Sequence, residues 1–106
     1  NSKIAVLSSM VFDLANTSGN LYADPAGFHK LTRTIGGTET VLVEGLCISQ
    51  RDNVNATKYQ RGASSISYLD SPSSTNTVTY KLFAKRGPNA NSASVSQSNI
   101  ILMETE

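Results

Sequence analysis

The residues that could act as nucleophiles or metal ligands are few and lie far apart. The chain contains one cysteine, Cys47, and one histidine, His29. A cysteine nucleophile needs a histidine base and an orienting partner nearby, and no local motif joins these two residues. Cys47 lies in the apolar stretch 41–48, where a free cysteine behaves as a small buried hydrophobe, and a lone cysteine cannot form an intramolecular disulfide. We predict that Cys47 is buried, that His29 takes a strand or surface position, and that neither is catalytic.

The acidic residues are also poorly arranged for chemistry, because they are scattered singly. Asp13, Asp24, Asp52 and Asp70 lack metal-ligand spacing, and three lie near expected strand ends, where aspartate caps the backbone N–H groups of a turn. Glycoside hydrolysis needs two carboxylates that converge on a cleft, and the Gly-Gly pair of this chain lacks the spacing of a phosphate loop. The sequence therefore predicts no enzyme, no metal site and no cofactor.

Composition narrows the classes of partner. Charged residues are 16% of the 106-residue chain and the net charge is +1, whereas Ser, Thr and Asn make up nearly a third. With no basic stripe between aromatics and no Trp, the chain is not expected to bind nucleic acid. The longest apolar run, residues 100–103, is far shorter than the roughly 20 residues that span a membrane. We expect one domain over residues 1–106. Because the first residue is Asn1 and not Met, we expect the chain to be a processed product, a fragment or the ordered part of a longer chain.

The distribution of residue types predicts β-structure. Runs rich in Val, Ile, Tyr, Phe and Thr are separated by clusters of Gly, Asn, Ser and Pro. Gly36 and Gly37 predict a tight hairpin, because glycine adopts positive φ without strain, and Pro72 ends a strand because proline cannot donate to a ladder. Seven or eight short strands at this spacing predict an all-β fold, an antiparallel β-sandwich or jelly roll. The clear runs cover residues 3–12, 28–35, 40–48, 65–70, 77–85 and 99–104, with shorter candidates at 54–59 and 94–96.

Two of the expected strands are apolar on both faces, which bears on assembly. A strand covered on one side should alternate apolar and polar residues, and neither the first run, 3–12, nor the last apolar run, 100–103, does so. A two-layer sandwich covers only one face of each sheet. We therefore expect a partner subunit on the second face, the alternative being a preceding segment or a loop of the same chain. The residues expected at the subunit contact are Leu7, Tyr68, Tyr80, Ile101 and Met103.

Several segments resemble one protein family. These are SISYLDSP at residues 65–72, TYK at 79–81 and NIILME at 99–104, together with SKIAVL at 2–7 and an L-x-R run before the glycine pair. In this order they are similar to the C-terminal head domain of marine bacteriophage tail-fibre and virion proteins, over roughly residues 2 to 104. The resemblance implies a trimeric jelly roll of C1q and TNF type at the tip of a fibre, as the C-terminal part of a longer virion protein. It also implies a structural and adhesive role on the virion surface, outside the cell.

The function expected from this resemblance is attachment of the virion to a host-surface glycan or protein, with three weak loop sites acting together. The partners would be two further copies of the chain and other virion proteins. Two alternatives remain at this point, a capsid decoration or stabilising protein and a cellular C1q-like carbohydrate-binding module. The contact loops are expected at 16–27, 51–62 and 87–91, because loops carry variable recognition. The candidate contact residues within them are Asn20, Tyr22, Arg51, Asn53, Asn55, Arg61 and Asn89.

Overall fold

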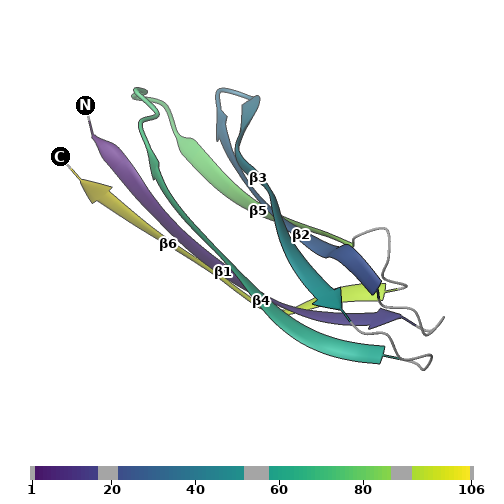
Figure 1. The fold of residues 1–106 in the computed structure, drawn as a ribbon. Coiled ribbons are helices and arrows are strands. Elements are labelled where there is room, and N and C mark those ends of the chain that lie inside the picture. The colour runs from purple at the N-terminus through teal and green to yellow at the C-terminus, as the bar shows by residue number, and fades with distance from the viewer. Residues whose placement is uncertain (1, 17–21, 52–57, 87–91, 106) are drawn as a thin grey trace.

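The computed structural model describes residues 2–16, 22–51, 58–86 and 92–105, and in these ranges the chain is all β-strand and connection, with no helix. The predicted all-β antiparallel sandwich is confirmed (Figure 1). The strands are β1 (Lys3–Asn16), β2 (Tyr22–Ile35), β3 (Thr38–Arg51), β4 (Lys58–Asp70), β5 (Val78–Arg86) and β6 (Ser92–Thr105).

The described residues form six strands, whereas the sequence predicted seven or eight. The two runs expected at 94–96 and 99–104 are parts of the continuous strand β6, because the polar residues between them pair with β1 like their neighbours. Ser96 is the extra residue of a β-bulge there, since Val11 pairs with Gln97 and Phe12 with Val95. Of the short strand expected at 54–59, residues 58–59 open β4, and the rest lies outside the described residues.

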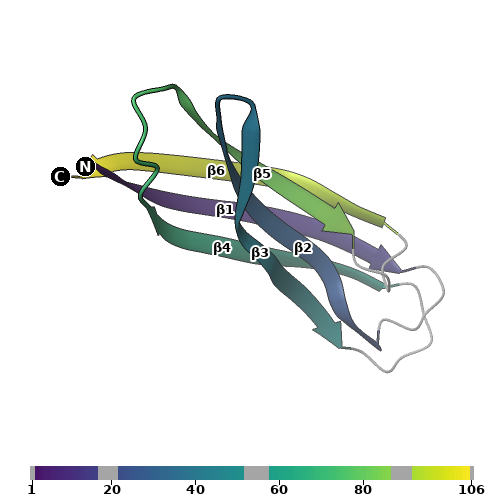
Figure 2. The ribbon, with the colours of Figure 1, turned by 90° about the horizontal axis from the view of Figure 1, so that it is seen from above.

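The strands form two three-stranded antiparallel sheets, with the orders β4-β1-β6 (sheet A) and β3-β2-β5 (sheet B). The sheets lie face to face, so that β3 lies beside β4 and β5 beside β6 (Figures 1 and 2). The predicted hairpin at Gly36 and Gly37 joins β2 to β3, and both glycines have positive φ, +56° and +82°. The principal-axis extents are 54, 22 and 18 Å, so the sandwich is elongated along its strands.

The hydrophobic core is small and follows the period-two alternation of the strands. Its fully or nearly buried apolar side chains are Val6, Met10 and Phe12 of β1, Leu31 of β2 and Ile66 of β4. On β5, alternate residues point inward as well, and Tyr80 and Leu82 pack against this core. Polar side chains also lie between the sheets, because Ser8, His29 and Asp70 are buried. The two sheets are therefore joined by hydrogen bonds as well as by apolar packing.

A β-bulge interrupts the pairing of β2 with β3. His29 pairs with Leu46 and Leu31 pairs with Val43, so Lys30 alone stands opposite Glu44 and Gly45. Gly45 has φ of +86°, a value that L side chains rarely adopt, and an added Cβ would meet nothing within 4 Å. The bulge therefore leaves open space beside Gly45 on the outer side of sheet B.

Candidate functional site

The buried histidine joins the two sheets. His29 of β2 has no exposed surface, and its Nε2 lies 3.4 Å from Ser8 Oγ of β1 while its Nδ1 lies 3.1 Å from Ser64 Oγ of β4. Burial lowers the pKa of the ring below its ordinary value, which favours the neutral form with one donor and one acceptor nitrogen. His29 does take a strand position, as one of the two predicted options. Because Ser8 is only 6% exposed, a substrate cannot reach this pair in the folded chain.

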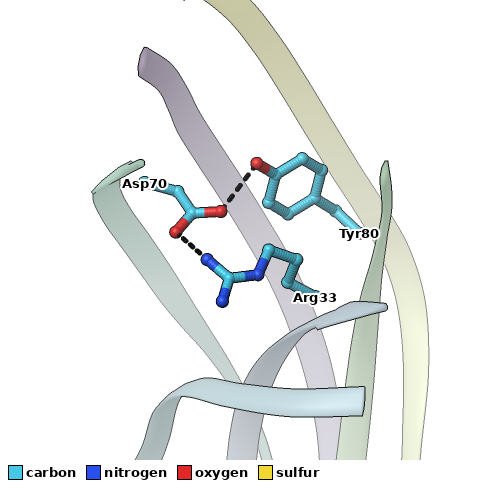
Figure 3. A network of polar contacts seen from close by, with 3 residues as sticks. All are labelled: Arg33, Asp70 and Tyr80. Carbon is cyan, nitrogen blue, oxygen red and sulfur yellow. Dashed lines mark hydrogen bonds and ion pairs between the residues drawn. The ribbon is translucent and has the colours of Figure 1, made fainter. Parts of the chain in front are cut away.

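A second polar group joins the sheets at the C-terminal end of β4 (Figure 3). Asp70, the last residue of β4, accepts a hydrogen bond from Arg33 Nη1 at 2.6 Å on Oδ1 and one from the Tyr80 hydroxyl at 2.8 Å on Oδ2. Asp70 is 3% exposed, so this is a charge-assisted pair largely withdrawn from water. Burial, together with the bond to Asp70, raises the pKa of the Tyr80 phenol. The expected turn-capping role of Asp70 is therefore wrong, because both oxygens bind side chains of sheet B.

The outer face of sheet A is apolar where β4, β1 and β6 lie side by side. Val6 and Ile66 point to sheet B, so the alternate residues point away from it. Leu7 is the register partner of Ile101, and Ala5 is the partner of both Met103 and Leu69. These side chains form the outer apolar face, which consists of Leu7, Leu69, Ile101 and Met103, with exposed fractions of 39, 55, 54 and 49%.

Strand β6 is exposed on both faces, unlike the other apolar strands. Its inward-pointing side chains at Val95, Ile100 and Leu102 remain 39, 39 and 49% exposed, since sheet B barely reaches over this edge. Natural edge strands usually carry Lys, Pro or short lengths that prevent further pairing. The 14 residues Ser92–Thr105 contain neither Lys nor Arg nor Pro, and Glu104 is their only charge. The edge that β6 presents is therefore long and carries little charge, its apolar part is residues 100–103, and the β-bulge at Ser96 interrupts its polar part.

The five residues predicted at a subunit contact separate into two groups. Leu7, Ile101 and Met103 lie together on the outer apolar face. Tyr68 and Tyr80 point to the opposite side, where both are half-buried against the core. Leu69 belongs to the outer apolar face and was missed from the sequence. The alternation of SISYLD was the available signal, because it puts Leu69 opposite in direction to Ile66 and Tyr68.

The residues predicted to contact a receptor have different outcomes. Asn20, Asn53, Asn55 and Asn89 lie outside the described residues. Tyr22 and Arg51 are register partners at the far end of the β2–β3 pair. Arg61 lies instead on the exposed outer side of β4, where its Nε donates to Asp13 Oδ1 at 2.8 Å. That bond lowers the pKa of the Asp13 carboxyl and occupies Arg61.

The strand ends that flank the predicted contact loops meet at one end of the sandwich. β1 ends at Asn16 opposite Lys58, where β4 begins, and the far ends of β2 and β3 lie at the same end. The start of β1 and the end of β6 lie at the other end of the sandwich (Figure 2). The long axis of the sandwich measures 54 Å. The fold therefore separates these strand ends from the start of β1 and the end of β6.

A hollow of about 690 Å³ opens at the terminal end, below the connection between β4 and β5. Its apolar wall includes Ile4, Val78, Tyr80 and Leu102, and its rim is made of hydroxyl and amide side chains from residues 73–76, with Glu104 opposite. Ser73 has φ of +49°, which lies in the left-handed region. No single segment of the sequence predicts this hollow, because its walls come from β1, β5 and β6.

The described residues contain no group of three or more His, Cys, Asp or Glu side chains that could hold a metal ion. Within the same ranges, no helix is long and apolar enough to cross a membrane. The side chain of Cys47 lies outside the described part, although its backbone pairs with Phe28 in β3. Comparison with family models, curated proteins and solved structures found no match. Over the residues that the structure describes, the chain is an antiparallel β-sandwich of six strands.

Proposed function

We propose that this chain is the head domain of a bacteriophage tail fibre or similar virion projection, which forms a homotrimer and attaches to the host surface. The observation that carries the proposal is the outer apolar face, continuous with the exposed strand β6. Burying the exposed half of each of its four large side chains would contribute about 1 kcal/mol apiece. A chain so rich in Ser, Thr and Asn would not otherwise leave this cluster in water.

The arrangement of the two ends of the sandwich supports the attachment role. The termini lie at one end and the strand ends that flank the three candidate loops lie at the other (Figure 2). If β1 and β6 of each copy face the shared axis, the loops of all three copies point the same way. Weak loop sites would then act together through effective concentration.

The first test is the native mass of the chain, by light scattering or native mass spectrometry. We expect three times the 11.3 kDa of one chain. The double variant Leu7→Lys/Ile101→Lys should be monomeric and folded, because both side chains are solvent-facing in one copy. The matched control is Val41→Lys, since Val41 is 45% exposed but lies on β3 of the other sheet. A monomeric wild type, or a control variant that dissociates equally, would overturn the assembly part.

The second test separates attachment from capsid decoration, which uses the same outer apolar face. Labelled trimer should adsorb to bacterial cells, and a variant with residues 52–57 replaced by a Gly-Ser turn should lose adsorption while keeping its native mass. Unchanged adsorption by that variant would contradict the loop sites. Antibody labelling on the shell of particles, and not on their projections, would indicate a decoration protein instead.

A further inference from the structure

Phenylalanine and lysine side chains alternate on the outer side of sheet B. His29, Leu31 and Arg33 of β2 point toward sheet A, so the residues between them point outward. Phe28 is the register partner of Lys85, and Lys30 is the partner of Phe83. Phe28 and Phe83 are therefore diagonal neighbours, and Lys30 and Lys85 are the other diagonal pair. We call these four residues the Phe–Lys patch.

The patch lines a hollow that the β-bulge keeps open. Its volume is about 580 Å³, within the range of small-ligand sites, and its walls are the four patch residues with Glu44, Gly45 and Ala84. Gly45 contributes no side chain, and an added Cβ there would meet nothing within 4 Å. The floor is therefore backbone, and the walls are two rings, two ammonium groups and one carboxylate.

We propose that the Phe–Lys patch binds an anionic glycan, a sugar chain that carries carboxylate or phosphate groups. Phe83 is 39% exposed on a strand, and its ring offers an apolar surface to the C–H face of a sugar. Lys30 Nζ lies 4.9 Å from the centre of that ring, which holds the ammonium beside any ligand on it. The hollow carries a net positive charge, because Lys30 and Lys85 face one carboxylate, Glu44, and this charge favours an anionic ligand. The Glu44 carboxylate can accept hydrogen bonds from sugar hydroxyls.

Edge protection does not account for this arrangement. Lysines on the edge strand β5, such as Lys81 and Lys85, discourage further strand pairing. Lys30 and Phe28, however, belong to the central strand β2, whose two edges are already paired. A nucleic acid is a poorer occupant than a short glycan, because its affinity comes from many phosphate contacts, whereas the patch offers two lysines on a chain with a net charge of only +1. The site does not depend on the trimer, although its use in attachment rests on the proposed function.

The binding test uses the intact chain and three probes, trigalacturonic acid, uncharged galactotriose and a 12-residue oligothymidylate, with affinity measured by NMR titration. We expect the trigalacturonate to bind, with shifts centred on β2 and β5, and the other two to bind far more weakly. Phe83→Ala should weaken binding about tenfold through lost apolar contact. Lys30→Gln should do the same through a lost charge-assisted bond and should reduce the dependence on salt.

Lys81→Gln is the matched control, since Lys81 is exposed on β5 but does not line the hollow. It should change affinity less than twofold, and the circular dichroism of all variants should equal that of the wild type. Binding of galactotriose equal to that of trigalacturonate would overturn the anionic assignment. Tighter oligothymidylate binding through Phe83 and Lys30 would assign the patch to nucleic acid, and no binding of any probe at millimolar concentration would overturn the site. The native mass is measured separately, so a failed trimer and a failed glycan site are distinguishable.

Discussion

Replacement of Asp70 by Asn tests how much the polar group of Figure 3 contributes to folding. Asn has nearly the same shape, so the change removes the charge and leaves no cavity. The side chain of Asp70 is 4% exposed and that of Arg33 is 20% exposed, and their bond is 2.6 Å long. Without the carboxylate, a largely buried guanidinium loses its counter-charge, which costs about 3–5 kcal/mol at fully buried pairs. Because Arg33 keeps some contact with water, we expect a loss of about 2–4 kcal/mol.

The assay is urea denaturation followed by circular dichroism, with the free energy of unfolding extrapolated to water. A domain of this size has a stability of about 5–15 kcal/mol, so Asp70→Asn should lower the midpoint strongly. Tyr80→Phe removes only the hydroxyl bond to Asp70, and we expect a loss of about 1–2 kcal/mol. Asp13→Asn is the matched control, because Asp13 pairs with Arg61 at the surface, where ion pairs contribute little.

A double-mutant cycle with Arg33→Met isolates the pair itself. If the reasoning is right, Asp70→Asn costs much less in the Arg33→Met background than in the wild type, since no unpaired charge is then left behind. A loss below about 0.5 kcal/mol for Asp70→Asn, or one equal to that of Asp13→Asn, would refute the assignment of a buried inter-sheet ion pair.

Three further predictions concern other parts of the fold. Because burial lowers the pKa of His29 in the folded chain, the free energy of unfolding should be full above pH 6.5 and fall below it, where the unfolded chain takes up a proton first. Urea denaturation at pH 8 and at pH 5 measures this difference in stability. A His29→Gln variant should no longer show the difference. Gly45→Ala should cost about 1–2 kcal/mol through its positive φ alone, measured by the same denaturation, and an unchanged midpoint would contradict the bulge. The melting temperature of the wild type should rise with protein concentration, whereas that of Ile101→Lys should not, and a concentration-independent wild type would argue against assembly.

The sequence predicts local features of this fold better than it predicts how strands combine. The hairpin at Gly36 and Gly37 follows from the positive φ that glycine adopts, and β-strand structure over residues 77–85 follows from their residue types, which are local properties. The continuity of β6 did not follow, because Gln97 and Ser98 look like a break in the sequence, although both pair with β1. In the same way, the sequence suggests a turn cap at Asp70, since its partner Arg33 lies 37 residues away on another strand.

The candidate sites show the same difference between features of one strand and features that depend on how strands pair. Period-two alternation identified Leu7, Ile101 and Met103 as side chains in need of cover, and β-pairing brings them together on one face. It could not tell which of the two faces points inward, and so it grouped Tyr68 and Tyr80 with them. The Phe–Lys patch could not be predicted from the sequence for another reason. It needs the register of β2 against β5 and a bulge of β3, and neither is encoded in any one segment.

In this sandwich, polar side chains lie between the sheets and several apolar side chains lie on the outer face of sheet A. Inside, His29 and Asp70 join the sheets by hydrogen bonds, and each such group must be withdrawn from water before it gains its partner. Outside, Leu7 and Ile101 keep 39 and 54% of their surface in water, and that surface adds nothing to the folding of one chain. Burial of the outer apolar face between copies would add that contribution, because the polar groups fix the geometry of each sandwich and apolar contacts would then join the sandwiches. On this argument, assembly would be coupled to the folding of one chain through β1 and β4, which carry buried side chains on one side and the exposed Leu7 and Leu69 on the other.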